Sequence, residues 1–166
     1  MIRSLRFAAV PALALALVLG AQACATGGNC PTSGESRRLL DHEVLMSGYR
    51  ADGATTENRE GTIVVRYEDL GVIATVRVND EKALLIMSTI WGKKADVIPD
   101  ADWLLKINGQ NRDGIVKVYL DNDADVVTEW LLEVRDGLGL QQVAEATRVF
   151  AARSRQVALE LAGYIQ

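Results

Sequence analysis

The chain has 166 residues, a formal net charge of −4 and a hydrophobic fraction of 49%. That length is enough for one domain of ordinary size, with a core that needs neither disulfides nor metal. The Arg and Lys residues of this acidic chain form no long basic stripe, so we expect no nucleic-acid partner.

The first 23 residues have the pattern of a secretory signal peptide. Arg3 and Arg6 precede an uncharged run over residues 7–19, and small residues follow at 20–23. The apolar run is too short to span a membrane comfortably. We therefore expect export to the periplasm or cell envelope. The chain is predicted to divide into signal peptide, flexible tether and folded domain over residues 1–23, 24–35 and 36–166.

Both cysteines lie in the tether, and their fate has several alternatives. The sequence Ala21-Gln22-Ala23-Cys24 fits a permissive lipoprotein signal, although Ala21 replaces the usual Leu or Val. Cleavage after Ala25 would instead remove Cys24. If both cysteines survive unmodified, Cys24 and Cys30 can close a small disulfide loop in an oxidising compartment. A lipid on Cys24 is the one membrane attachment that we expect.

The folded domain is predicted to begin with a helix over residues 37–47. Ser36 can cap this helix, and Gly48 supplies a natural end. We expect a short strand at 49–52 and a polar turn region over 54–61.

Three strands are predicted next, over residues 62–68, 72–78 and 83–91. Apolar and polar side chains alternate in the first two, and Asp69-Leu70-Gly71 joins them as a hairpin. The third strand is more uniformly apolar, which is typical of the middle of a sheet. Because helices can cover only one face, its apolar residues on both sides predict an uncovered sheet surface.

The second half of the chain is predicted to form a helix, two strands and a long helix, with Asp100 as the cap of the first helix. The ranges are about 100–108, 115–120, 126–134 and 140–164. Glu129 and Glu133 share the polar side of the last strand. The order α-β-β-β-β-α-β-β-α predicts an α+β domain, an antiparallel sheet of five to six strands with helices packed on one face.

The residues that could carry chemistry favour structural roles. His42 is the only histidine, and Cys24 and Cys30 have no other soft ligands beside them, so we expect no catalytic residue, metal site or cofactor, and no enzyme activity. The three tryptophans lie in apolar segments and are predicted to pack in the core; they are Trp91, Trp103 and Trp130.

The run Asp121–Asp125 resembles the opening of a calcium loop. Val126 and Leu132 stand where such a loop has its Gly and its bidentate Glu. Asn and Asp also suit tight hairpin turns, so we predict a turn here and keep a weak surface calcium site as a hypothesis.

Asn108 and Asn111 end the second predicted helix, Tyr119-Leu120-Asp121 leads into the hairpin turn, and Gly137-Leu138-Gly139 precedes the last helix. With the order of elements, these residues resemble the YbjN domain family over about residues 42–164. That family commonly has an Asn-x-Trp-Asn element at the joint, where Gln110 here replaces the tryptophan. Its fold is similar to that of type III secretion chaperones, which bind extended client segments as dimers.

The resemblance implies a non-catalytic scaffold, and two hypotheses follow. In the first, the domain is an envelope binding or chaperone-like module that holds a protein or peptide on its sheet surface or a strand edge, with a homodimer and a regulatory role as further expectations. In the second, it is a small-ligand or metal-binding sensor, or a hydrolase, that uses the Asp121–Asp125 turn or a pocket around Trp103 and Asn108. We prefer the first, because the sequence offers few converging polar groups.

Overall fold

The computed structural model describes residues 38–112, 114–135 and 137–166, and within them the elements follow the predicted order α-β-β-β-β-α-β-β-α. The signal peptide, the tether with Cys24 and Cys30, and the Ser36 cap lie outside the described residues. The elements are α2 (His42–Ala51), β1 (Thr55–Arg59), β2 (Thr62–Tyr67), β3 (Val72–Asn79), β4 (Leu84–Trp91), α3 (Ala101–Gln110), β5 (Lys117–Leu120), β6 (Val126–Glu133) and α4 (Leu140–Glu160).

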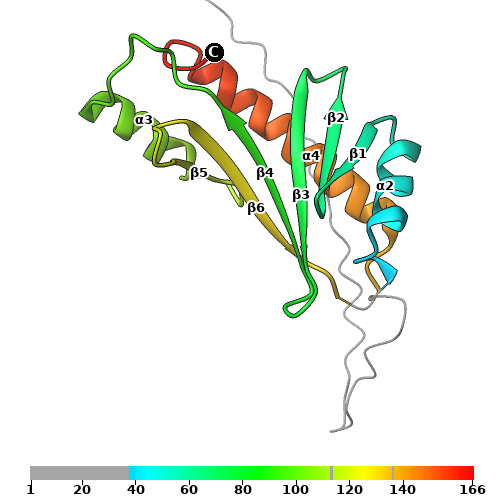
Figure 1. Ribbon diagram of the computed structural model, residues 1–166. Helices are drawn as coiled ribbons and strands as arrows, with labels where there is room; N and C mark the ends of the chain where they lie inside the picture. Colours follow the sequence, from blue (N-terminus) through cyan, green and yellow to red (C-terminus); the bar gives the residue numbers. More distant parts are fainter. Residues whose placement is uncertain (1–37, 113, 136) are drawn as a thin grey trace, which may run out of the picture. The chain divides into compact units, whose positions relative to one another are not determined.

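The six strands form one antiparallel sheet in the order β1-β2-β3-β4-β6-β5 (Figure 1). The predicted α+β class and antiparallel sheet are confirmed. β4 lies inside the sheet, paired with β3 through Thr75 and Ser88 and with β6 through Ser88 and Glu129. That position explains its apolar side chains on both faces.

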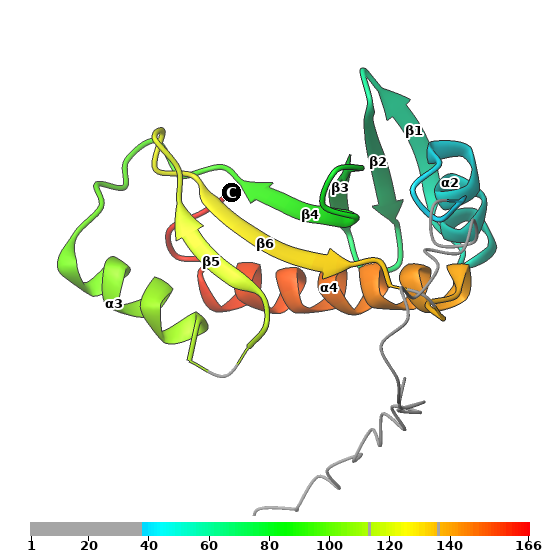
Figure 2. The ribbon, with the colours of Figure 1, turned by 90° about the horizontal axis from the view of Figure 1, so that it is seen from below.

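Helix α4 covers one face of the sheet. Figure 2 shows it running beneath the strands, with α2 near one end and α3 near the other. Its inward stripe repeats at helical spacing and is fully buried at Val143, Phe150, Val157 and Leu161. These side chains pack on the alternate strand residues that face the same way, such as Val65, Val76 and Met87. Among the described residues, no helix has the length and apolar character needed to cross a membrane.

The first helix differs from the prediction at both ends. It begins after Asp41, whose carboxylate accepts hydrogen bonds from the amides of Glu43 and Val44 at 2.9 and 3.1 Å. Gly48 does not end the helix but lies within it, where a Cβ atom would come within 2.7 Å of the Leu140 side chain. The glycine therefore permits close packing of α2 on the start of α4.

The strand expected at 49–52 is wrong, and so is the turn region at 54–61. Tyr49 belongs to α2 because its ring is buried in the core, where its hydroxyl lies 3.4 Å from Thr147 Oγ1. The first strand is β1, which pairs with β2 through a two-residue turn. Glu60 and Gly61 adopt the positive φ angles, 51° and 81°, that such a hairpin turn requires.

The end of the chain also departs from the helix predicted to reach residue 164. α4 ends at Glu160, and the following residues turn back to pair with the segment after β4. The Lys94 amide donates to the Tyr164 carbonyl at 2.9 Å, and the Gln166 amide donates to the Gly92 carbonyl at 2.9 Å. This pairing fixes the last turn of the protein to the sheet.

Candidate functional site

The face of the sheet opposite α4 carries exposed apolar side chains, and of the described helices none covers it (Figure 2). We call this surface the open face. Because side chains alternate along a strand, the register identifies its members. On its three central strands they are Ile73, Thr75 and Arg77 of β3, Leu84, Ile86, Ser88 and Ile90 of β4, and Val127, Glu129, Leu131 and Glu133 of β6. The exposed fractions are 52% at Ile73, 64% at Ile90 and 42% at Leu131.

Charge is separated across the open face. Arg66 of β2 and Arg77 of β3 lie on one side of β4, Glu129 and Glu133 of β6 lie on the other, and the open-face residues of β4 are uncharged. Glu133 is paired with Arg135 at 2.5 Å, and the hydrogen bond from that guanidinium lowers the pKa of Glu133. Within residues 38–112, 114–135 and 137–166, no ion pair involves Arg66, Arg77 or Glu129.

One edge of the sheet is closed by a side chain. The amide group of Asn111, directly after α3, accepts a hydrogen bond from the Val118 amide and donates one to the Val118 carbonyl, both at 2.8 Å. It thus satisfies the two outward backbone groups of β5 as a neighbouring strand would. This gives a physical role to Asn111, one of the positions that resemble the YbjN family.

The opposite edge, at β1, is closed to a smaller degree. The hairpin turn closes on Arg59 and Thr62, so alternate residues Thr55, Glu57 and Arg59 bond to β2. Thr56 and Asn58 then direct their backbone groups outward. The Thr56 hydroxyl accepts a hydrogen bond from Arg50 Nε at 2.8 Å, while the Arg59–Glu57 ion pair at 2.9 Å keeps charge on this strand.

The Asp121–Asp125 run forms a hairpin turn in which carboxylates bind backbone groups. Asp121 Oδ1 accepts hydrogen bonds from the amides of Asp123 and Asp125, both at 2.9 Å. Asp125 Oδ1 accepts from the Lys93 amide at 2.7 Å. Ala124 takes the positive φ angle, 63°, that completes the turn. The aspartates therefore do the work expected of turn residues.

The other positions that resemble the family are structural or lie on the open face. The carbonyl of exposed Asn108 accepts from the Asn111 amide at 3.2 Å. Tyr119, 40% exposed, lies on the open-face side of β5 beside Glu129, and burial together with the Glu129 charge raises the pKa of its phenol. Gly137 has a φ of 87°, and the Gly139 amide donates to Gln142 Oε1 at 2.7 Å at the start of α4.

Gln110, in the place of the family's tryptophan, connects α3 to α4. Its amide nitrogen donates to Glu160 Oε2 at 2.7 Å, and its carbonyl oxygen accepts from Arg153 at 3.3 Å. A polar network therefore holds the two helices together at this point.

The tryptophans pack as the sequence predicted. Trp103 is fully buried and stacks on Tyr164 with ring centroids 5.3 Å apart, while Trp91 and Trp130 are half-buried against the core. The Trp103 ring therefore fills the space where the second hypothesis placed a pocket.

His42 is the first residue of α2, half-buried beside Asp41. In the part of the chain that the structure describes, no three His, Cys, Asp or Glu side chains gather closely enough to hold a metal ion.

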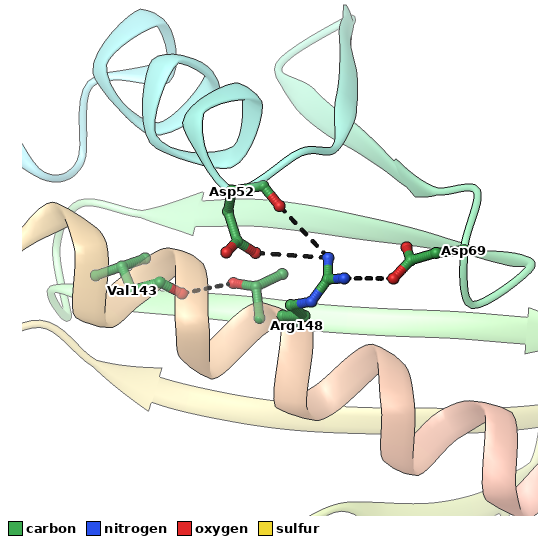
Figure 3. A network of polar contacts seen from close by, with 5 residues as sticks. Asp52, Asp69, Val143 and Arg148 are labelled. Atoms are coloured by element: carbon green, nitrogen blue, oxygen red, sulfur yellow. Dashed lines mark hydrogen bonds and ion pairs between the residues drawn. The ribbon is translucent and has the colours of Figure 1, made fainter.

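On the covered side, Arg148 of α4 joins three elements. Its guanidinium pairs with Asp69 between β2 and β3, and lies 3.8 Å from the Asp52 carboxylate at the end of α2 (Figure 3). It also lies over the Tyr67 ring, 5.3 Å from the centroid. Burial, followed by the nearby Asp52 charge, raises the pKa of the Tyr67 phenol.

A shallow depression of about 710 Å³ lies between α2 and α4, lined by Gly48, Asp52, Leu140 and Arg148 among others. Since the Arg148 guanidinium is already paired with two carboxylates, its charge serves mainly to hold α2 and the β2–β3 turn against α4.

A chain of three buried hydroxyls crosses from the sheet to α4. Thr89 Oγ1 lies 2.5 Å from Thr128 Oγ1, which lies 2.7 Å from Ser154 Oγ. All three residues are at most 2% exposed. The chain separates two apolar clusters of the core and has no opening to solvent, so it fixes the position of α4 on the sheet.

The residues most suited to binding, Ile73, Arg77 and Ile90, were not singled out by the sequence reasoning. The two-residue alternation of their strands was a sufficient signal for their outward direction. Their assembly into one surface depends on the strand order, which alternation does not give.

A family model described as "YbjN: Putative bacterial sensory transduction regulator" matches residues 43–162. A search of curated protein sequences finds no match.

Two solved structures are similar to this chain. The crystal structure of YbjN from E. coli, titled "a putative transcription regulator", has a TM-score of 0.62 at 16% sequence identity, over 77% of this chain and 97% of that one. The structure of the HopA1-SchA chaperone-effector complex contains a chain with a TM-score of 0.51 at 12% identity, over 76% of this chain and 96% of that one. At these identities the likeness shows the fold.

Proposed function

Because this chain belongs to the YbjN family, described as a regulator of sensory transduction, we propose that it is an exported, non-catalytic binding module of the bacterial cell envelope. In this proposal it holds a protein or peptide partner on the open face, and the holding serves regulation. The observation that carries it is the exposure of Ile73, Ile90 and Leu131 on a sheet face with charge on both sides.

Three further features support a binding role. An uncovered sheet face with an apolar centre and a charged border has the composition of a protein-docking surface. The fold is shared with a chain in a chaperone-effector complex, a protein class that holds other proteins. The titratable groups near the open face, such as Tyr119 and Glu133, lie on an exposed surface and not in a cleft, which is a poor setting for acid–base catalysis.

Export rests on the signal-like pattern of residues 1–23. A lipid on Cys24 would hold the domain at a membrane, and a Cys24–Cys30 disulfide would leave it free. The intact mass of the protein from the envelope fraction tests this directly. A mass that still contains residues 1–23 would overturn the proposal of export.

Site-specific photo-crosslinking in living cells tests the binding role. A photoreactive residue at Ile90, on the open face, should form adducts with another protein chain. The same residue at Leu159, which is 60% exposed on α4, is the matched control. The adducts from position 90 should disappear when Ile86→Asp is added. Absence of any adduct with another protein from position 90, or equal adducts from both positions, would overturn the proposed function.

A second candidate function is the sensing of a small ligand in the depression beside Arg148, where Asp52 Oδ2 is buried and has no hydrogen-bond partner. A thermal-shift screen with metabolites and metal ions tests it. A rise in melting temperature that Arg148→Ala abolishes would favour this function over the first, and no shift with any compound would dismiss it.

A further inference from the structure

We propose that a second copy of this chain docks on the open face, so that two sheets pack face to face about a two-fold axis parallel to β4. This inference rests on the proposed function in one respect, because both require the open face to be a docking surface. It adds the chemistry of the first occupant, which the arrangement of charge on the face itself selects.

The first argument is that the open face is complementary to itself. Its positive groups, Arg66 and Arg77, lie on strands at one side of β4, and its negative group without an ion pair among the described residues, Glu129, lies on the strand at the other side. A surface with equal and opposite charges on the two sides of an uncharged strip can be its own partner. A partner of a single sign of charge would match one half and be repelled by the other.

The register places these charges opposite each other. A rotation of 180° about an axis parallel to β4, between two facing sheets, puts β3 of one copy over β6 of the other. Arg77 lies in the same cross-strand row as Ile86 and Leu131. Glu129 is two residues from Leu131 on the same face, so Arg77 of one copy comes within reach of Glu129 of the other. The symmetry makes this contact twice.

The second argument concerns the apolar centre. The axis runs along β4, so Ile86 and Ile90 of one copy meet the same residues of the other, and Ile73 meets the β6 side with Leu131. Two antiparallel sheets that bury such alternate apolar residues pack with their strands about 30° apart. Docking would remove from water the 64% of Ile90 and the 52% of Ile73 that the single chain leaves exposed. A partner with the same order of charges would compete with the second copy.

The mass of the protein in solution tests the inference. The full chain is expressed, purified in its processed form, and examined by light scattering and sedimentation over a range of concentrations. We expect twice the mass of the chain. Ile90→Asp should give the monomer, whereas Ile98→Asp should leave the dimer intact, because Ile98 is 83% exposed but lies in the loop before α3. A wild-type monomer throughout the range would overturn the inference.

Charge reversal gives a sharper test. Arg77→Glu alone places Glu opposite Glu, and Glu129→Arg alone places Arg opposite Arg, so each variant should dimerise about tenfold more weakly or worse. Mixed in equal amounts, the two variants should form a heterodimer, since both of its contacts then join Glu to Arg. The variant with both changes should dimerise with itself. Circular dichroism and melting temperature confirm that each variant is folded.

A dimer that persists in Ile90→Asp and both charge variants, or that is lost in Leu105→Asp on the exposed side of α3, would place the interface elsewhere and overturn the inference. The crosslinking experiment separates this failure from that of the proposed function. A monomer that still forms adducts with another protein from position 90 overturns the inference alone. A dimer whose adducts from position 90 contain only this chain supports the inference and overturns the proposed function.

Discussion

The sheet has a part that the protein closes by itself and a part that it leaves open. α4 covers one face, and Asn111 closes the β5 edge with two hydrogen bonds of 2.8 Å. The open face carries Ile90 at 64% exposure. On β4 the two kinds of position alternate residue by residue, with Leu85 and Met87 fully buried and Ile90 exposed.

This difference separates the residues that stabilise the fold from those available to a partner. A side chain facing α4 contributes to the free energy of unfolding of the single chain, because its apolar surface is already buried. A side chain on the open face has that free energy still to gain on binding. Substitutions on the two sides should therefore have different effects, even for the same residue type.

The largest expected difference is between two leucines. Leu85→Ala should lower the free energy of unfolding by about 2–5 kcal/mol, since it leaves a cavity beneath α4. Leu131→Ala, on the open face at 42% exposure, should lower it by about 0.5 kcal/mol or less. Urea unfolding followed by circular dichroism at low protein concentration measures both. Equal losses would mean that the open face is covered in the single chain.

The covered side should also show a pH dependence. Burial raises the pKa of Tyr49 to about 12, and the hydrogen bond with Thr147 offsets this in part. The raised pKa means that the folded chain holds the phenol proton at pH values where the unfolded chain, with a pKa of about 10, has released it. The free energy of unfolding should be constant below about pH 10 and then fall by about 1.4 kcal/mol per pH unit up to about pH 12.

Tyr67 acts in the same direction, since burial and the Asp52 charge raise its pKa as well. Tyr49→Phe should remove the contribution of Tyr49 to this slope without adding any slope between pH 6 and 9. Urea midpoints measured across the pH range in both proteins give the comparison. An unchanged slope in Tyr49→Phe would show that Tyr49 is not the buried group responsible.

The buried hydroxyl chain allows a prediction about polar pairing beneath the sheet. Thr128→Val leaves the hydroxyls of Thr89 and Ser154 without their shared partner, and should cost about 1–3 kcal/mol. The triple variant Thr89→Val, Thr128→Val, Ser154→Ala removes all three hydroxyls and should recover most of that loss. Thermal and urea unfolding test both variants. A triple variant less stable than Thr128→Val would show that the hydroxyls stabilise the fold beyond satisfying each other.

The smallest expected effect concerns the closed edge. Asn111→Ala exposes the Val118 amide and carbonyl to water, with an expected cost of about 1 kcal/mol. It also creates a second free edge, so light scattering should detect more high-mass species on storage. Asn108→Ala, at an exposed position on α3, is the control and should change neither property. Identical behaviour of the two variants would remove the edge-closing role of Asn111.

The alternation of apolar residues was sufficient to predict β2, β3, β4 and β6 and the side of each strand that faces the core. Asp100 was predicted correctly as the cap of α3, where it accepts from the Trp103 amide at 2.8 Å. Local patterns work here because the signal and the structure involve the same few residues. The open face could be anticipated in the same way, from the apolar residues on both sides of β4.

The errors fall where distant contacts outweigh local preference. Gly48 has the sequence signal of a helix end, but the packing of Leu140 against it continues α2 to Ala51. The polar run Thr55–Arg59 has little strand character of its own and forms β1 by pairing with β2. Residues 164–166 pair with 92–94 instead of extending α4.

The sequence by itself determined the class of the domain, the order of its elements and the inward and outward sides of its main strands, because hydrophobic burial imposes a period that the residues display. Only the tertiary structure decided which strands are neighbours. It thereby placed Arg77 on one side of β4 and Glu129 on the other, and brought Asn111 to the edge at Val118. Such contacts join residues far apart in the chain, and their pairing depends on the packing of the whole domain rather than on any local pattern.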